Sequence, residues 1–220
     1  TALASRTVAE IAAALPGATA VFRRHKLDFC CGGGAKLADA AAARGTDLAT
    51  LESELAALEM PDDAVPESSA ALIALIETRY HAIHRRELPE LIRLARRVEA
   101  VHGAKPDAPR GLADLLAGMA VELEDHMQKE EQVLFPMMLR GSDSMIGGLM
   151  ISGPIATMRH EHDNHGGHLR ALAVLTHDGV PPVHACNTWR ALYAGTQKLT
   201  DDLMEHIHIE NNVLFPRFGA

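Results

Sequence analysis

Apolar residues recur every three or four positions through most of the chain, which is the spacing of amphipathic helices. After residue 69 this pattern predicts four long helices, and the first carries Leu72 and Ile76 on one stripe. The other three are expected to begin near residues 109, 152 and 183. We expect the Gly-, Ser- and Met-rich segment 141–153 to be a slack crossover loop rather than a lid. Four such helices bury their apolar stripes against one another, so the sequence predicts an all-α protein with a four-helix bundle.

The first part of the chain has shorter helical patterns that turn residues interrupt. Thr7 and Glu10 have the spacing of a capping box. Residues 59–69 are rich in Pro, Ser and acidic side chains, which is typical of an interdomain linker. We therefore predict a small helical domain at residues 1–58, a linker at 59–69 and the bundle at 70–220.

Two stretches of the chain share one motif. Each has an acidic residue followed directly by a His, a Glu four residues after that His, and then the run Val-Leu-Phe-Pro. The motif pairs His126 with Glu130 in the first copy and His206 with Glu210 in the second. Self-similarity of this kind indicates a duplicated unit. Residues four apart lie on one face of a helix, so each copy directs an imidazole and a carboxylate toward the same point.

Each copy also follows a helix that carries another histidine. His84 lies 42 residues before His126, and His162 lies 44 residues before His206. A lone motif is better explained by a core histidine and a solvated glutamate, but a buried glutamate is costly unless it is paired or binds a metal. The duplicated set therefore predicts two metal ions, each with two imidazoles, bridged by two carboxylates. The predicted ligands are His84, His126, Glu130, His162, His206 and Glu210.

Several metals suit these ligands. Imidazole and carboxylate bind iron, zinc or manganese, and the order of affinities does not choose among them. An open, carboxylate-bridged pair favours iron over zinc, whose structural sites are usually tetrahedral and closed. The acids one turn before the motif histidines, Glu122 and Asp202, are candidates to accept the second imidazole N–H. His165, one turn after His162, competes with it as the ligand from the third helix.

Composition excludes several classes of partner and location. The net charge is −8 and no run of Lys or Arg stands out, so we expect no nucleic-acid partner. Arg6 and Glu10 interrupt the first 25 residues, which therefore do not resemble a secretory signal. Residues 139–158 are apolar but contain Arg140 and Asp143, so no membrane span is expected. Three cysteines, two of them adjacent, favour a soluble protein of the reducing cytoplasm.

The motifs together resemble those of the RIC (repair of iron centres) family over nearly the whole chain. The resemblance is carried by Leu27–Gly33, Tyr80–Arg85, His126–Glu131, Glu161–Asp163 and His206–Pro216. Members of that family are di-iron proteins that pair a short N-terminal domain bearing Cys-Cys-Gly-Gly with a hemerythrin-like four-helix bundle. The resemblance implies the same six ligands for two iron ions in an oxo-bridged centre, with Glu130 and Glu210 as the bridges.

The resemblance also implies a function. Family members are cytoplasmic, often dimeric, and associated with restoring iron–sulfur clusters damaged by nitric oxide or oxidants. The expected partners are damaged iron–sulfur proteins, with nitric oxide or oxygen species as small ligands and a second copy as homodimer partner. We expect a repair protein rather than an enzyme. The alternatives are an oxygen-binding or oxygen-sensing hemerythrin, whose carriers use five His unevenly divided, and a di-iron reductase of nitric oxide or peroxide.

Cys30 and Cys31 are candidates for a redox pair or for iron and nitric oxide handling. Adjacent cysteines form a disulfide only in a strained ring, which is readily reduced. The following glycines allow close approach of a partner, and a helix beginning at Ala35 would stabilise a nearby thiolate. The alternative is two small residues buried in a tight turn. The family resemblance favours the functional role.

Overall fold

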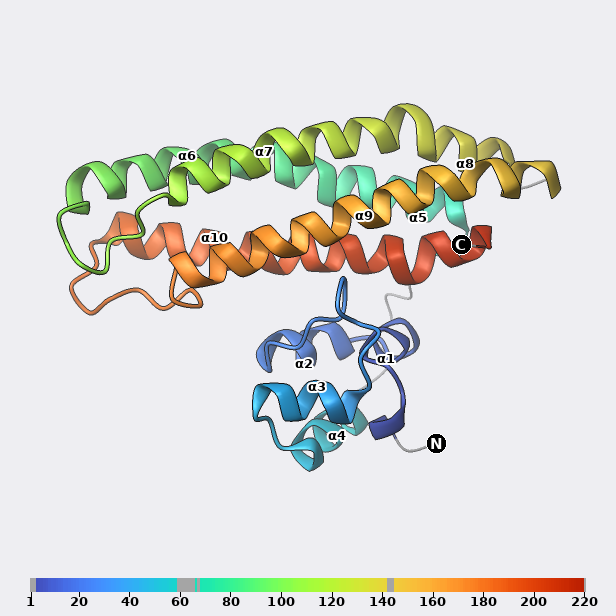
Figure 1. The fold of residues 1–220 in the computed structure, drawn as a ribbon, viewed down its shortest axis with the longest axis horizontal. Helices are drawn as coiled ribbons and strands as arrows, with labels where there is room; N and C mark the ends of the chain where they lie inside the picture. The colour runs from blue at the N-terminus through green and yellow to red at the C-terminus, as the bar shows by residue number, and fades with distance from the viewer. Residues whose placement is uncertain (1–2, 59–65, 67, 142–144, 220) are drawn as a thin grey trace. The chain divides into compact units, whose positions relative to one another are not determined.

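The computed structural model describes residues 3–58, 66, 68–141 and 145–219, with the backbone alone for 141 and 145–150. The described chain is helical and contains no strand, which confirms the predicted all-α class. No described helix has both the length and the apolar character needed to cross a membrane. The α-helices (Figure 1) are α1 (Val8–Ala14), α2 (Ala18–Arg24), α3 (Leu37–Arg44), α4 (Leu48–Ala56), α5 (Ser69–Leu75), α6 (Ala82–His102), α7 (Leu112–Lys129), α8 (Phe135–Gly141), α9 (Met145–Leu175) and α10 (Asn187–His208).

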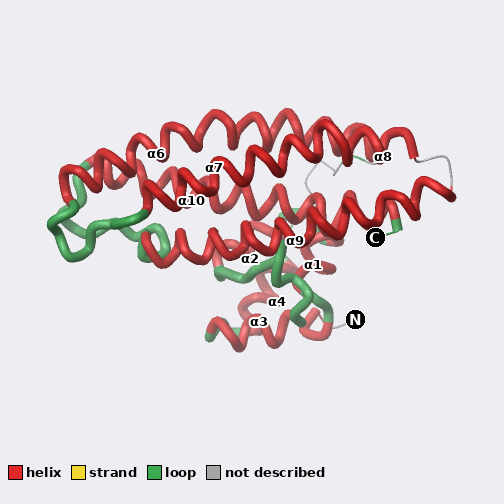
Figure 2. The backbone as a smooth tube through the Cα atoms, turned by 45° about the horizontal axis from the view of Figure 1, so that its top comes forward, coloured by secondary structure: helices red, strands yellow, loops and turns green. Residues whose placement is uncertain are grey.

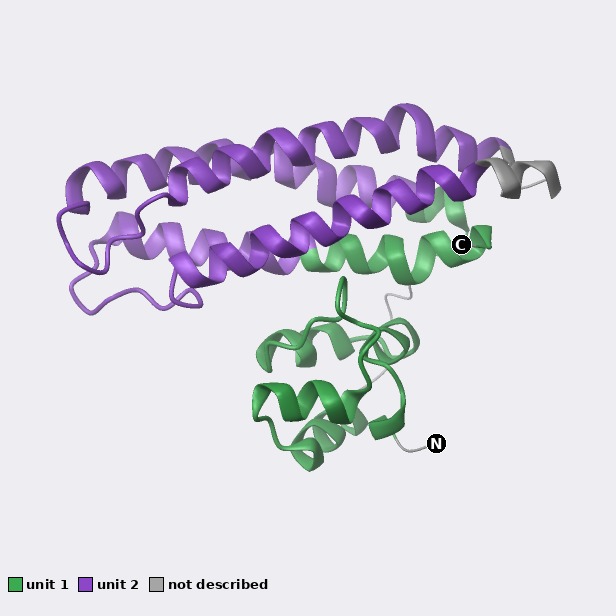
Figure 3. Cartoon of the chain, viewed as in Figure 1, with its two compact units in different colours: residues 1–72, 204–220 green, residues 73–203 purple. Residues whose placement is uncertain are grey.

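The chain divides into two compact units, coloured separately in Figure 3. One unit contains residues 1–72 and 204–220, and the other contains residues 73–203. The boundary falls inside the continuous helix α10, so the C-terminal end of this helix belongs to the same unit as the N-terminal helices. Most of the predicted linker, 59–69, lies outside the described residues.

Local sequence signals account for the short helices of the first unit. Thr7 Oγ1 accepts the Glu10 N–H at 3.1 Å, and Glu10 Oε2 accepts the Thr7 N–H at 2.9 Å, so the predicted capping box is formed. Asp47 caps α4 by accepting the Thr50 N–H at 2.9 Å. The helices enclose an apolar core of fully buried side chains that includes Ile11, Phe22, Phe29, Leu37 and Leu51.

Long amphipathic helices form the second unit. Helix α6 packs on α7, and α7 packs on α9, with their axes running lengthwise along one another (Figure 2). The apolar stripes that the sequence predicts supply the contact, because burial of apolar surface is the main stabilising term for such packing. Buried side chains along these helices include Leu88, Leu116, Leu123, Leu172 and Trp189.

Within the described residues, three π-helical segments adjoin the long helices: η2 (Ile76–His81), η3 (Glu130–Leu134) and η4 (Ile209–Leu214). A π-helical turn closes i to i+5 hydrogen bonds, so it holds an extra residue and shifts the following side chains around the helix. Such segments occur frequently at functional sites. His81 ends η2, Glu130 begins η3, and Glu210 is the second residue of η4.

The third long helix begins earlier than the sequence predicts. Helix α9 starts at Met145, so residues 145–153, expected to be a crossover loop, are helical. Pro154 therefore lies inside the helix instead of in its first turn. The good helix formers Met, Ile and Leu of this segment outweigh its glycines. The remainder of the predicted crossover, residues 142–144, lies outside the described residues.

The capping box gives a direct stability test. Replacing Thr7 by Ala removes the acceptor for the Glu10 N–H, and we expect the free energy of unfolding to fall by about 1 kcal/mol. Chemical denaturation of the full chain measures this change. Thr157→Ala is the matched control, because Thr157 is exposed inside α9 and donates to the Gly153 carbonyl. An equal loss in both variants would show that the Thr7 cap contributes nothing specific.

Candidate metal centre

The two repeated motifs have the same local geometry. His126 Nε2 lies 3.3 Å from Glu130 Oε1, and His206 Nε2 lies 3.3 Å from Glu210 Oε1. All four side chains are buried, with exposed fractions of 0 or 1%. The i, i+4 spacing thus places an imidazole and a carboxylate together in each copy, as the helical pattern predicts.

His162 of α9 approaches the first motif. Its Nε2 lies 3.1 Å from His126 Nε2, with ring centroids 4.8 Å apart, and it is fully buried. Two ring nitrogens that converge at this distance in a buried position, beside a carboxylate, are a group that could hold one cation.

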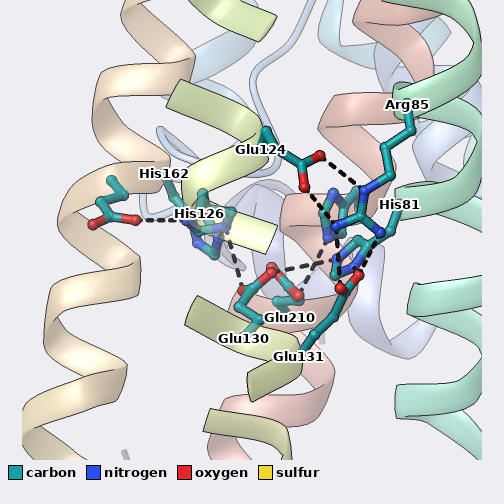
Figure 4. A network of polar contacts seen from close by, with 10 residues as sticks. His81, Arg85, Glu124, His126, Glu130, Glu131, His162 and Glu210 are labelled. Carbon is teal, nitrogen blue, oxygen red and sulfur yellow. Dashed lines mark hydrogen bonds and ion pairs between the residues drawn. The ribbon is translucent and has the colours of Figure 1, made fainter. Parts of the chain in front are cut away.

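Two groups of potential ligand atoms result, each with all its atoms within 4.8 Å of one another. One group contains His81, Glu130, His206 and Glu210, and the other contains His126, Glu130, His162 and Glu210. Figure 4 shows His81, His126 and His162 beside the two glutamates. The two groups share both carboxylates, so each offers two nitrogens and two oxygens. This donor set suits iron, zinc or manganese and excludes the thiolate-rich sites of structural zinc.

His81, and not His84, completes the first of these groups. His84 is fully buried on α6, but neither group contains it. His81 Nε2 lies 3.4 Å from Glu130 Oε2, and Nδ1 donates to Glu131 Oε1 at 2.7 Å. The π-helical segment η2 ends at His81 and changes which residues share a face, a feature that a regular helical period does not reveal. Spacing does not separate the two histidines, because His81 precedes His126 by 45 residues and His84 precedes it by 42, against 44 between His162 and His206.

Carboxylates outside the centre orient its imidazoles. Nδ1 of His126 donates to Glu161 at 2.8 Å, which leaves Nε2 facing the centre. This hydrogen bond, with one from Lys129 at 2.6 Å, lowers the pKa of Glu161 to about 2, so the carboxylate is ionised at neutral pH. Glu131 holds His81 in the same way and also accepts from Arg85 at 2.7 Å.

The acids predicted from helical spacing have other partners. Glu122 lies near His168, at 3.7 Å, while Glu161 of another helix takes the place beside His126. Asp202 accepts from Arg79 at 3.0 Å and from Lys198 at 2.6 Å, so both of its oxygens are engaged by cations. The partners of Glu122 and Asp202 are set by contacts between helices, which cannot be predicted from the periodicity of a single helix.

The other histidines of α9 belong to neither of the two groups. His160 is exposed. His165 is buried but belongs to a third group of potential ligands, with Glu122 and His168. Burial, aided by the neighbouring His126 and His162, lowers the pKa of His165 to about 3, so its ring is neutral at pH 7.

The adjacent cysteines lie in the loop before α3. Cys30 is buried and Cys31 half-buried, both are free thiols, and their sulfurs are 3.5 Å apart. Asp28 Oδ1 accepts the N–H groups of both cysteines, at 3.1 and 3.0 Å. The hydrogen bond with Cys31, followed by burial and the charge of Asp28, raises the pKa of Cys30 well above its usual value. The expected thiolate stabilisation by a helix beginning at Ala35 is therefore wrong for Cys30, since α3 begins at Leu37 and the local charge is negative.

This loop is bonded to the helix end that carries Glu210. Asn212 Nδ2 donates to the Phe29 carbonyl at 3.2 Å, and Asn211 Nδ2 donates to the Cys30 carbonyl at 3.5 Å. The Phe29 ring meets the His208 ring edge-on with centroids 5.5 Å apart. Residues next to a predicted ligand thus hold the backbone of the cysteine pair.

Known proteins share both parts of this chain. Residues 73–218 match the hemerythrin HHE cation binding domain, and residues 4–59 match a domain of unknown function, DUF542. Relatives include the iron-sulfur cluster repair protein YtfE of Yersinia pseudotuberculosis serotype IB (strain PB1/+) and that of Yersinia pestis (strain Pestoides F). Each is 48% identical over 217 residues, which cover 97% of this chain and 96% of the relative. The chain therefore belongs to the RIC family of hemerythrin-like proteins, as its motifs indicate.

Proposed function

We propose that this protein is a di-iron protein that takes part in the repair of iron–sulfur clusters damaged by nitrosative or oxidative stress. The observation that carries the proposal is the pair of buried ligand groups that share Glu130 and Glu210. The relatives of 48% identity, which are named iron-sulfur cluster repair proteins, support the same role.

Two cations resolve an electrostatic conflict at the centre. Glu130 and Glu210 are fully buried and contribute ligand atoms to the same groups. Two buried carboxylates at this separation repel each other and lose their hydration, which is costly without compensating positive charge. Metal ions bound between them supply that charge, so the residues present fit a di-iron centre.

The assignment of ligands follows from the two groups. In the proposal, His126 and His162 bind one ion, His206 and a histidine of the first long helix bind the other, and Glu130 and Glu210 bridge. The geometry favours His81 over the expected His84 for that remaining position, because Nε2 of His81 faces Glu130 while Nδ1 is held by Glu131. When bound, the oxo-bridged iron pair supplies redox and ligand-exchange chemistry.

The even division of ligands supports repair over oxygen carriage. Oxygen carriers with a hemerythrin-like bundle use five His unevenly divided, whereas each group here contains two imidazoles and shares two carboxylates. An even set with few protein ligands per ion leaves positions for exchange. In the proposal the protein acts in the cytoplasm on damaged iron–sulfur proteins. It forms a homodimer, as members of the family often do, and its small ligands are nitric oxide or oxygen species.

We propose for Cys30 and Cys31 a redox role or a role in handling iron and nitric oxide. The raised pKa of Cys30 keeps its thiol protonated. In the proposal the thiol becomes available as a proton donor and a sulfur ligand when a partner displaces Asp28. The two sulfurs are close enough to act on one ligand together.

Removing a bridge should remove iron. We expect Glu130→Leu to lower bound iron below that of the parent protein and to abolish any oxo-bridged absorption, because both ions lose a shared ligand. Iron analysis with visible spectroscopy measures this, and Glu90→Leu, an exposed glutamate paired with Arg93, is the control. Two tightly bound irons in folded Glu130→Leu would refute the bridging role.

The first long helix offers a choice between two buried histidines. We expect His81→Ala to lose iron and His84→Ala to retain it, because only His81 belongs to a ligand group. Iron analysis of each variant decides between them, and circular dichroism checks that each variant is folded. The reverse result would restore His84 as the ligand and assign His81 to orienting its neighbours.

The cysteine pair should matter for repair but not for iron binding. We expect the double variant Cys30→Ala, Cys31→Ala to keep its fold and iron while reactivating a nitrosylated iron–sulfur enzyme more slowly than the parent. Cys186→Ala, an exposed cysteine elsewhere in the chain, is the control. Undiminished reactivation by the double variant would remove the cysteines from the mechanism, and no reactivation by the iron-loaded parent would overturn the proposed function.

A further inference from the structure

We propose that Glu122, His165 and His168 form a separate site for one divalent cation, through which iron passes to and from the di-iron centre. One ligand atom of each residue lies within 4.8 Å of the others, and none of the three belongs to the two central groups. Two imidazoles and one carboxylate form a set that binds Fe(II) or Zn(II) with positions left open.

The backbone brings these residues together from two packed helices. His165 and His168 are three residues apart on α9, so they lie on one face of that helix, and Glu122 lies on α7. Glu122 Oε2 is 3.7 Å from His168 Nδ1. Ligands of one ion bound at about 2.0–2.2 Å lie roughly 3–4 Å apart, so this pair already has a suitable separation.

A simple ion pair between Glu122 and His168 does not explain His165. This residue is 3% exposed, and its Nε2 is buried without a hydrogen-bond partner among the described residues. A buried polar atom without a partner is costly, and native proteins usually satisfy such atoms. A cation at the cluster would satisfy the nitrogen and join all three side chains.

The site formed by Glu122, His165 and His168 is open to solvent on one side and closed on the other. The Glu122 side chain is 53% exposed and that of His168 is 27% exposed, while His165 is closed off from solvent. An ion can therefore enter past Glu122 and His168 and meet His165 last. Because the Glu122 side chain is exposed, it is free to follow the ion.

His165 connects this site to the centre. It follows His162 by three residues on α9, and its ring meets the His126 ring edge-on with centroids 5.1 Å apart. His126 and His162 are both proposed iron ligands. The transfer, which rests on the proposed function, exchanges only coordination bonds: the ion moves as Fe(II), and no electron changes place.

Cobalt(II) binding to the iron-loaded full-length protein tests the site itself. We expect one equivalent of Co(II) with all iron retained, and a weakening by more than about tenfold in Glu122→Gln and in His168→Ala, since even loss of an outer partner costs 10–100-fold in metal affinity. His160→Ala, an exposed histidine on the same helix, should bind as the parent does. Absence of the Co(II) equivalent in the parent, or its persistence in both variants, would overturn the site.

Iron exchange tests the role. We expect Fe(II) release from the loaded protein to a colorimetric chelator to slow several-fold in His168→Ala and Glu122→Gln, but not in His160→Ala. Unchanged release in both variants would overturn the transfer role. Both measurements use no iron–sulfur substrate, so a failure of this proposal is distinguishable from a failure of the repair function.

Discussion

The burial of two carboxylates, Glu130 and Glu210, is the constraint on which the rest of the site depends. Carboxylates are rarely buried completely unless they are paired or bind a metal. Metal ions bound there would supply the compensating charge, and the helices bring the imidazoles of the two ligand groups to the same place. The outer carboxylates Glu131 and Glu161 then fix the histidines so that Nε2 faces inward.

Helical periodicity and the internal repeat predict much of this arrangement. The four long helices, the capping box at Thr7 and the pairing of His126 with Glu130 all follow from spacing within a single helix. Such features are local, because neighbours at i, i+3 and i+4 meet whatever the tertiary structure is. The family resemblance could be recognised for the same reason: its motifs are short stretches with fixed internal spacing.

Features that depend on irregular turns or on contacts across helices could not be predicted in this way. The π-helical segment at Ile76–His81 ends on the histidine that joins a ligand group, whereas the predicted ligand His84 lies outside both groups. Glu161 reaches His126 from α9, so the one-turn rule that proposed Glu122 fails. The raised pKa of Cys30 depends on its hydrogen bond with Cys31, on burial and on Asp28, and the last two effects do not follow from the Cys-Cys-Gly-Gly motif alone.

The duplicated motifs have unequal surroundings, and this inequality has a chemical consequence. Beside His126 the structure has Glu161, Lys129 and the Glu122–His165–His168 cluster, a polar environment that suits the exchange of a cation. After His206 the chain continues into Asn211 and Asn212, which hold the loop of Cys30 and Cys31. The two copies of the motif therefore differ in the donor atoms around them. Nitrogen and oxygen donors surround the His126 copy, and the cysteine sulfurs belong to the loop bonded to the chain after His206. Repair of a cluster requires both iron and a group that displaces damaged ligands. A duplicated bundle can supply the iron site from one half and the displacing group from the other, because the two halves can diverge in sequence outside the shared glutamates.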